Sequence, residues 1–404
     1  MRKQVSVGEA QEMLLNLARI KETEEVSVTN SMNRVLACDI YASIPIPPFN
    51  RSPLDGYALR GEDTEKASEE NPVVLRITEE IYAGKTPEHV VLPGTAAKIL
   101  TGAPIPEGAN SVVRFEDTEW DSKYVRISKP VKPDANVIYE GEELQKDSLI
   151  LKKGTLITPA VMGLMASQGI NTCGVYKKPR VAVITTGSEL TDEGEKLCYG
   201  KIYNSNLYTI SGYIRNLGLE CVEIGNVEDD LNSIASKIGE ALEISDIVVT
   251  TGGASVGDYD YAVSSLKKIG AEIIFWKVKM KPGMATLAAQ KDGKLILGLS
   301  GNPGSATLGL MRIMQPYLLK CCGRAEYMPE EIDVILKSGV KKSSPSTRLL
   351  RGKLSVNNGQ AFFEENAGQG NGMIKSFLDF DLVGEISAVS PPVPAGTMIK
   401  AYRY

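Results

Sequence analysis

The sequence predicts an α/β multi-domain fold in which a doubly wound parallel sheet is flanked by β-rich segments. Strand and helix signals alternate from residue 176 to residue 326, whereas the segments on either side carry β-type alternation with many prolines and glycines. The length of 404 residues exceeds that of one ordinary core and indicates roughly two to four domains.

Before residue 176 the predicted elements are mostly strands. The prolines of IPIPPFN punctuate the chain, and strands are predicted at PVVLRI and VVRFEDTEW, with the proline- and glycine-rich loop TGAPIPEGAN between them. The segment SLILKKGTLITPAVMGLMASQGI then predicts a strand and a helix, with Thr158 and Pro159 at the N-cap and first-turn positions.

The middle of the chain alternates between strands and helices. RVAVITTGSEL predicts a strand that runs into a T-T-G turn, and it is followed by the helix NLYTISGYIRNLG, the strand LECVEIGNV and the helix DLNSIASKIGEAL. DIVVTTGGAS, YAVSSLKKIG and EIIFWKVKMK continue as strand, helix and strand, and KDGK predicts a hairpin turn before the long helix SATLGLMRIMQPYLLKCC. Strands separated by helices predict a parallel sheet. Residues 327–404 are β-rich, with a hairpin signal at the N-G of SVNNGQAFF.

Composition and charge exclude several classes of protein. Hydrophobic residues make up 43% and charged residues 24% of the chain, and no run of 18 apolar residues occurs, so we expect no membrane span. The start of the chain indicates an amphipathic helix with a capping box at Ser6 and Glu9 rather than a signal peptide, so we expect a cytoplasmic protein. The formal net charge of -5 argues against bulk nucleic-acid binding.

Cysteine and histidine usage limits the chemistry. The six cysteines are scattered and form no C-x-x-C pair, so we expect buried, reduced thiols rather than a zinc ribbon or a redox motif. His89 is the single histidine, which leaves acid–base and metal chemistry to Asp, Glu and Lys.

Two turns, in ITTGSEL and VTTGGAS, follow predicted strands in the same strand-T-T-G form. Ligands of open α/β sheets bind outside the carboxyl ends of the strands, where both turns are expected. Free backbone N–H groups at the N-terminus of a helix can bind an anion. Asp258 and Asp260 beside the second turn suggest either a Mg²⁺ between these carboxylates and the anion or a plain helix cap. The alternative is a pair of ordinary strand-to-helix turns.

Three lysines mark the segment KVKMK. In an extended strand Lys277, Lys279 and Lys281 project from one face, where they repel one another unless an anion or an acidic partner neutralises them. A solvated edge strand is the alternative interpretation.

Seven motifs occur in a fixed order: SPLDGYALRGEDT, TGAPIPEGAN, ITTGSEL, GKIYNSN, TTGGASVGDYDY, KMKPG and LSGNPGSAT. Together they resemble the molybdopterin molybdenumtransferases, the MoeA family that includes the E domain of gephyrin. The resemblance extends over nearly the whole chain. Each motif alone is a weak signal, but seven in order are specific.

The resemblance implies a four-part subunit that forms a homodimer. Its parts are an elongated N-terminal linker and dimerisation region (1–45 and 141–175), an inserted β-rich mixed α/β domain (46–140), a MogA-like α/β molybdopterin-binding domain (176–326) and a C-terminal β domain (327–404). The active site is then expected between the α/β domain of one subunit and the N-terminal domains of its partner.

The implied reaction takes adenylated molybdopterin (molybdopterin-AMP), uses Mg²⁺ to hydrolyse the phosphoanhydride, inserts molybdate and releases AMP. Phosphoanhydride cleavage needs cations along the phosphates, a metal and an oriented water, and an inserted oxyanion needs a second anion pocket. The positions that match the family's site are Gly252, Gly253 and Ser255 for the nucleotide or phosphate; Glu189, Asp229 and Asp260 for the metal or adenylate; Lys277 and Lys281 for anions; and Asp55 and Thr101 from the partner subunit. Candidates for the second anion pocket are the lysines and the turn before the next helix, with Ser300, Asn302 and Pro303.

The chain departs from the family pattern at several positions. Pro53-Leu54 replaces Ala-Met, Glu140 replaces an arginine, Ser300 replaces a proline and Met284 replaces a lysine, while Asn371 stands where a serine is common. Losing an arginine weakens anion binding. Three alternatives are a paralogue with altered oxyanion choice such as tungstate, a molybdopterin adenylyltransferase, and a non-catalytic molybdopterin-binding or scaffold protein. The length of the chain argues against the second, because an adenylyltransferase needs only the α/β block. A separate adenylyltransferase is instead a possible partner of this protein.

Overall fold

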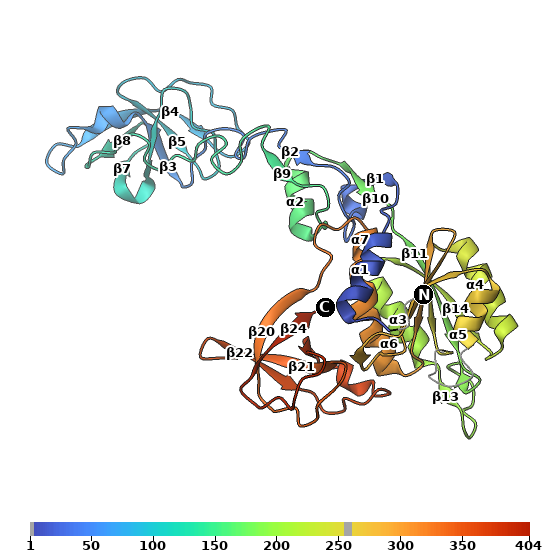
Figure 1. Ribbon diagram of the computed structural model, residues 1–404. Coiled ribbons are helices and arrows are strands. Elements are labelled where there is room, and N and C mark those ends of the chain that lie inside the picture. Colours follow the sequence, from blue (N-terminus) through green and yellow to red (C-terminus); the bar gives the residue numbers. More distant parts are fainter. Residues whose placement is uncertain (1–3, 254–260) are drawn as a thin grey trace. The chain divides into compact units, whose positions relative to one another are not determined.

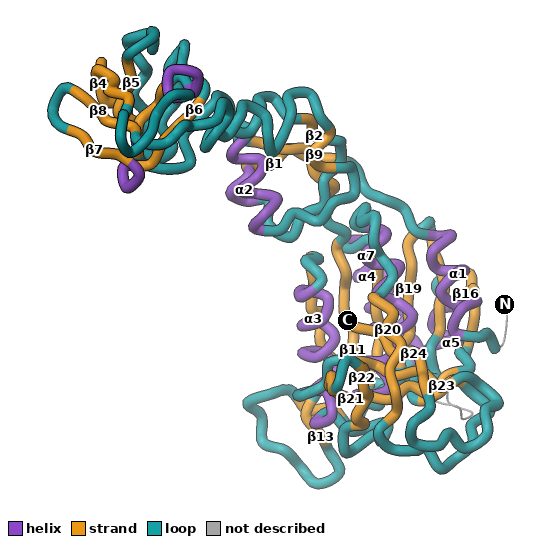
Figure 2. The backbone as a smooth tube through the Cα atoms, turned by 90° about the vertical axis from the view of Figure 1, so that its left-hand side faces the viewer, coloured by secondary structure: helices purple, strands orange, loops and turns teal. Residues whose placement is uncertain are grey.

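The computed structural model describes residues 4–253 and 261–404. Their contacts divide the chain into two compact units (Figures 1 and 2). The first unit contains residues 1–38, 153–162 and 172–404, and the second contains residues 39–152 and 163–171. Among the described residues, no helix has both the length and the hydropathy that a membrane span requires.

A six-stranded α/β sheet forms the centre of the first unit. Its strand order is β14 (Glu220–Val227), β11 (Arg180–Thr186), β15 (Ile247–Thr251), β19 (Lys294–Leu299), β18 (Leu287–Lys291) and β16 (Glu272–Trp276). The first four strands are parallel, as predicted. β18 runs antiparallel to its two neighbours, β19 and β16, so β16 again has the direction of the first four strands. The predicted KDGK hairpin is confirmed between β18 and β19, where Asp292 and Gly293 both have positive φ, as a type I′ turn requires.

Helices cover both faces of this sheet (Figure 1). One face packs against α1 (Val7–Leu17), α3 (Ser205–Asn216), α6 (Pro303–Gly309) and α7 (Gln315–Cys321), and the other against α4 (Leu231–Ile244) and α5 (Tyr261–Lys268). Alternate side chains of β11 pack into the two cores: Val183 packs on the side of α1, α3, α6 and α7, and Ile184 on the side of α4 and α5. A doubly wound layer of this kind follows from the alternation of strands and helices along the sequence.

The predicted long helix near residue 310 contains a π-helical turn. Leu310–Met314 forms this turn between α6 and α7. Pro316 cannot donate the hydrogen bond that the carbonyl of Arg312 would otherwise accept. The amide of Gln11 in α1 donates to that carbonyl instead, at 2.6 Å, so the buried oxygen is satisfied from a distant part of the chain.

The C-terminal part of the first unit is a closed β-barrel. Its strands are β20 (Glu330–Leu336), β21 (Thr347–Asn357), β22 (Gln360–Glu365), β23 (Leu382–Ile386) and β24 (Met398–Arg403), and pairing of β21 with β23 closes the ring. The predicted N-G hairpin is confirmed at Asn358 and Gly359. A short strand, β17 (Met280–Lys281), pairs with β21 and connects the barrel to the α/β sheet.

The second unit is built on a six-stranded sheet. Its strand order is β6 (Ser111–Arg114), β3 (Gly56–Leu59), β5 (Thr95–Ile99), β4 (Val73–Ile81), β8 (Tyr124–Ile127) and β7 (Thr118–Trp120). The strands β2 (Ile40–Tyr41) and β9 (Leu149–Leu151) pair where the chain enters and leaves it. The strands β1 (Thr23–Ser27) and β10 (Thr172–Tyr176) pair in the first unit, and α2 (Pro159–Ser167) begins with Thr158 bonded to the N–H of Val161 at 3.4 Å.

Candidate functional site

Three turns meet at the carboxyl edge of the α/β sheet. They follow β11, β15 and β19, whose ends lie in register: Thr185, next to the end of β11, pairs with Thr251, and Thr251 pairs with Leu299. The amide of Gly252 donates to the carbonyl of Leu299 at 3.2 Å, which joins the second turn to the third. This edge is where open α/β sheets bind ligands.

The Gly252–Gly253 turn requires glycine for both conformation and space. Gly252 has φ +92°, and a Cβ there would lie 2.1 Å from the carbonyl oxygen of Thr186. Gly253 has φ +65°, but the nearest atom to its Cβ position is 3.3 Å away. The hydroxyl of Thr186 is buried beside this turn without a hydrogen-bond partner among the described residues. Ser255 and Asp260 lie outside the described residues.

Two carboxylates lie at the turn that follows β11. Asp229 accepts a hydrogen bond from the N–H of Ser188 at 3.0 Å, and the carboxylate of Glu189 folds back over Gly187, 2.7 Å from where a Cβ would be. The described residues contain no cluster of three or more His, Cys, Asp or Glu side chains placed to hold a metal. A Mg²⁺ in a nucleotide site needs only one or two carboxylates besides phosphate oxygens, so Glu189 and Asp229 fit such an ion.

The three lysines of KVKMK do not share one extended strand, so that expectation is wrong. Lys277 has φ +74° and ends the strand directly after β16. The chain turns there because it pairs with the N-terminal segment: Val5 donates to the carbonyl of Lys277 at 3.1 Å, and Lys279 donates to the carbonyl of Val5 at 2.7 Å. The ammonium of Lys277 lies 4.4 Å from the ring centre of Trp276. Only Lys279 and Lys281 keep the predicted alternation with buried neighbours.

A cavity of about 500 Å³ lies between this sheet edge and the barrel. Lys281, Ser300 and Asn302 line it, whereas Pro303 begins α6 and is not among the lining residues. The lining residues include no Asp or Glu. They are Met280–Ala285, Ser300, Asn302, Ser305, Ser343–Ser346, Arg348 and Asn371. A cavity with cations, hydroxyls and amides but no carboxylate is chemically suited to an oxyanion.

Sequence reasoning missed the basic residues that the barrel contributes. Arg348 of β21 lines the cavity, and Arg351 of the same strand is fully buried. Arg351 donates to the carbonyls of Gly368 at 3.1 Å and Gly370 at 3.5 Å, but its Nε and Nη1 have no partner among the described residues. Nη1 lies 2.9 Å from the position of a Cβ on Gly304. Burial lowers the pKa of Arg351, although a guanidinium stays charged at neutral pH.

Asp55 and Thr101 are bonded to each other in the second unit. One carboxylate oxygen of Asp55 accepts from both the N–H and the hydroxyl of Thr101, each at 2.7 Å. These two bonds lower the pKa of Asp55 and keep it ionised. The pair is exposed in its own unit, so the carboxylate remains accessible to a ligand.

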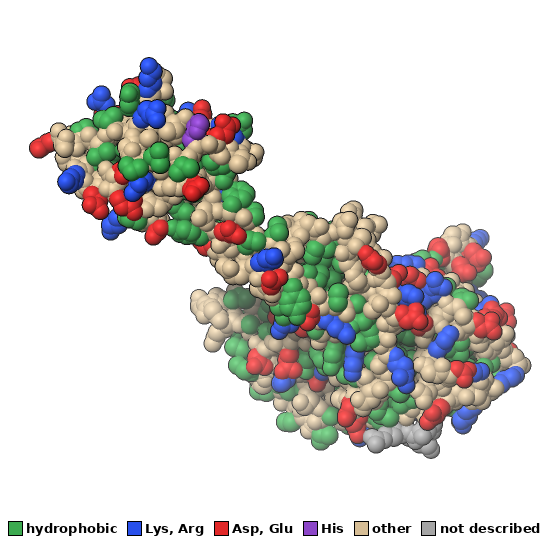
Figure 3. Space-filling view, turned by 90° about the horizontal axis from the view of Figure 1, so that it is seen from above, with side chains coloured by type: hydrophobic (Ala, Val, Ile, Leu, Met, Phe, Trp, Pro, Cys, Tyr) green, Lys and Arg blue, Asp and Glu red, His purple; other side chains and the backbone are tan. Residues whose placement is uncertain are grey.

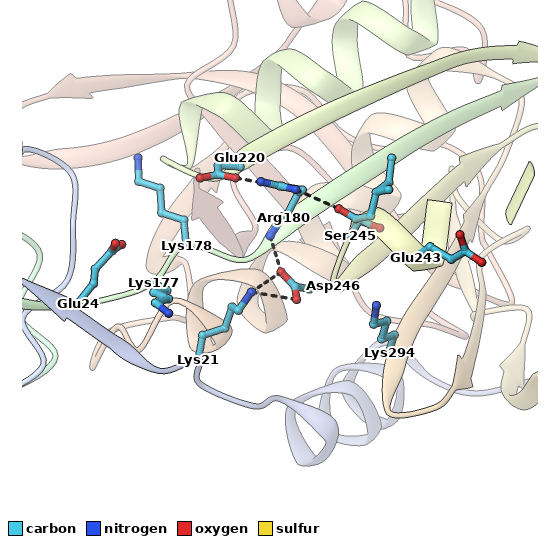
Figure 4. A pocket seen from close by; sticks show the side chains of 11 residues that line it. Lys21, Glu24, Lys177, Lys178, Arg180, Glu220, Glu243, Ser245, Asp246 and Lys294 are labelled. Atoms are coloured by element: carbon cyan, nitrogen blue, oxygen red, sulfur yellow. Dashed lines mark hydrogen bonds and ion pairs between the residues drawn. The ribbon is translucent and has the colours of Figure 1, made fainter. Parts of the chain in front are cut away.

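A second polar cavity, of about 360 Å³, opens at the amino edge of the α/β sheet (Figure 4). Its cations are largely neutralised by the protein itself. Lys21 pairs with Asp246 at 2.8 Å, Arg180 pairs with Glu220 at 3.2 Å, and Lys294 donates to the carbonyl of Leu242 at the end of α4. This cavity contains none of the predicted site residues. Basic and acidic side chains are also interspersed on the face shown in Figure 3, in keeping with the low net charge.

Comparison with known proteins supports one family over nearly the whole chain. Residues 5–169 match the family described as "MoeA N-terminal region (domain I and II)", and residues 182–320 match the "Probable molybdopterin binding domain". A molybdopterin molybdenumtransferase of Staphylococcus aureus is 39% identical over 355 residues, covering 88% of this chain and 85% of that protein. The enzyme of the same name from Staphylococcus epidermidis is 37% identical, with coverages of 87% and 84%.

Solved structures agree with these sequence relatives. The crystal structure of the molybdopterin biosynthesis moeA protein from Pyrococcus horikosii is 32% identical, with a TM-score of 0.82 and 99% coverage of both chains. A second structure, from Pyrococcus horikoshii OT3, is 29% identical, with a TM-score of 0.84 and full coverage of both chains. The family matches, the sequence relatives and the solved structures agree. The chain therefore belongs to the MoeA family of molybdopterin molybdenumtransferases.

Proposed function

We propose that this enzyme inserts molybdate into adenylated molybdopterin and releases AMP in a Mg²⁺-dependent reaction. The observation that carries the proposal is the arrangement at the carboxyl edge of the sheet. A glycine turn, two carboxylates and a cavity lined by cations but by no carboxylate lie on neighbouring strand ends. These are the groups that a phosphoanhydride and a second oxyanion require.

The proposal assigns separate tasks to the three turns. The Gly252–Gly253 turn, with Ser255, binds the phosphate or nucleotide, because bare backbone lets an anion approach closely. Glu189 and Asp229, together with Asp260, hold Mg²⁺, which neutralises charge on the phosphate oxygens when bound. Lys277 lies at the same edge as a further cation for the phosphates.

The cavity takes the inserted oxyanion. Lys281 supplies charge, and the side chain of Ser300 and the amide of Asn302 supply neutral hydrogen bonds, with Pro303 fixing the turn that carries them. Ser300 is itself almost fully buried, so an anion beside it is shielded from water. Electrostatic attraction is stronger in such surroundings than on an open surface.

Completion of the site by a second copy of the chain is part of the proposal. Asp55 with Thr101 is assigned to the cleft of the partner subunit in a homodimer. Complementation tests this: Asp55→Asn and Glu189→Gln are each expected to be inactive, while a mixture of the two, after subunit exchange, regains part of the activity. Activity that never returns in mixed dimers would place both residues in one subunit's site. Docking of an adenylyltransferase and a cytoplasmic location belong to the same proposal.

AMP release by the purified protein is the primary test. The enzyme is supplied with adenylated molybdopterin and Mg²⁺, together with molybdate, tungstate or neither, and a chelator arm removes the metal. Release stimulated by molybdate supports the proposal, whereas stimulation by tungstate alone favours the paralogue with altered oxyanion choice. Tight binding of the adenylate without any release would instead indicate a binding or scaffold protein.

A further inference from the structure

The barrel places a second cation directly beside Lys281. β17 and β21 are parallel, and Lys281 and Arg348 are register partners, so their side chains project from the same face of the sheet. Both line the cavity of about 500 Å³. Like charges directly opposite one another on neighbouring strands are destabilising. The repulsion between Lys281 and Arg348 therefore destabilises the fold, and a bound anion would relieve it.

The protein itself does little to neutralise this pair. Among the described residues, the side chain of Arg348 donates one hydrogen bond, from Nη2 to the carbonyl of Ser343 at 3.5 Å, and neither cation is within ion-pair distance of a described carboxylate. The carboxyl of Glu365 interacts electrostatically with Arg348 and Arg351 without forming an ion pair with either. Met284 contributes only a thioether to the cavity. The positive charge facing the cavity therefore comes from Lys281 and Arg348.

We infer that Arg348 is a specificity-determining residue that, with Lys281, binds the transferred oxyanion and selects a tetrahedral dianion over a monoanion. This inference rests on the proposed function, since it adds a ligand to the same oxyanion cavity. A guanidinium presents a fork of N–H donors to tetrahedral oxyanions, while an ammonium acts as a point charge. Two adjacent cations favour an anion that carries two charges. The serines of the 343–346 loop complete the shell with hydroxyl and backbone groups.

The test uses the full-length protein and compares two tetrahedral oxyanions of different charge. Molybdate carries two negative charges and perrhenate one. Titration calorimetry with each anion is performed on wild type, Arg348→Ala, Arg348→Gln and Arg348→Lys. Lys353→Ala is the matched control, because Lys353 is an exposed cation of the same strand that lies 3.8 Å from Asp379 and does not line the cavity.

Loss of a charge-assisted hydrogen bond predicts that Arg348→Ala and Arg348→Gln weaken molybdate binding about ten- to hundredfold. Perrhenate binding is expected to weaken less, so the ratio of the two affinities falls. Arg348→Lys is expected to keep part of the preference for molybdate over perrhenate, and Lys353→Ala is expected to change neither the molybdate nor the perrhenate affinity. The affinity for adenylated molybdopterin is expected to stay the same in every variant. Urea denaturation shows which variants are folded, and Arg348→Gln replaces Arg348→Ala if the latter is not.

Two results overturn the inference. One is unchanged molybdate affinity in the folded Arg348 variants, and the other is an equal loss for molybdate and perrhenate. The two hypotheses also fail differently. Wild type that neither releases AMP nor inserts molybdate overturns the proposed function. Wild type that is active, with an unchanged KM for molybdate in Arg348→Gln, overturns only the role of Arg348.

Discussion

Alanine substitution at the two adjacent glycines of the Gly252–Gly253 turn separates steric overlap from backbone strain. Both positions have positive φ, where an alanine costs about 1–2 kcal/mol. Only at Gly252 would the new Cβ also lie 2.1 Å from a backbone oxygen, that of Thr186, which adds about 1–3 kcal/mol of overpacking. We therefore expect Gly252→Ala to lower the free energy of unfolding by about 2–5 kcal/mol, against about 1–2 kcal/mol for Gly253→Ala.

Urea denaturation followed by the fluorescence of Trp276 measures this difference in the α/β sheet itself. The chain has two tryptophans, and the other, Trp120, lies in the second unit, so a Trp120→Phe background isolates the signal. With a slope of about 2–3 kcal/mol per molar urea, the midpoint of Gly252→Ala is expected to fall by about 1–2 M. Equal midpoints for the two alanine variants, at equal slopes, would refute the steric argument.

Three further predictions concern the charged groups of the first unit. Arg351→Met is expected to stay within about 1 kcal/mol of wild-type stability in urea, because removing a buried charge that has no ion-pair partner among the described residues offsets the carbonyls of Gly368 and Gly370 that are left unpaired; a large stability loss would contradict this. Burial raises the folded-state pKa of Glu365 above 4.5, so its ionisation destabilises the fold as the pH rises through that pKa. Glu365→Gln is therefore expected to be more stable than wild type at neutral pH and to show a flatter profile of urea midpoints above pH 4.5. Asp229→Asn should keep the fold and the bond from Ser188 but require about tenfold more Mg²⁺ for half-maximal AMP release, and an unchanged Mg²⁺ dependence would remove Asp229 from the metal site.

Features coded by adjacent residues could be predicted from the sequence. The T-T-G turns after β11 and β15, the Asp292-Gly293 hairpin and the Asn358-Gly359 hairpin each depend on a few neighbouring residues whose backbone preferences are strong. The alternating strand and helix signals predicted the doubly wound sheet for the same reason. The residue boundaries of the four predicted parts and the roles of the site residues stay predictions.

Features that depend on distant pairing could not be predicted. Lys277 leaves the strand because the chain pairs with Val5, which local propensity does not reveal. Arg348 faces the cavity only because β17 adds to the barrel beside β21, and the register of that pair is a tertiary property. Arg348, within SSPSTRLLRG, carries no sequence signal of its own.

The bond from Gln11 to the carbonyl of Arg312 has a consequence for how the chain folds. It joins residues 301 positions apart, and the apolar face of α1, with Val7, Ala10 and Leu14, packs in the same core. Contacts of such long sequence separation form late, since a large loop must close before they are made. During synthesis α1 therefore emerges well before its partner in the core, and its apolar face stays exposed until most of the residues between them have followed it. A fragment that begins at the α/β block would leave that core face open, so any shortened or fused form of the protein should keep α1.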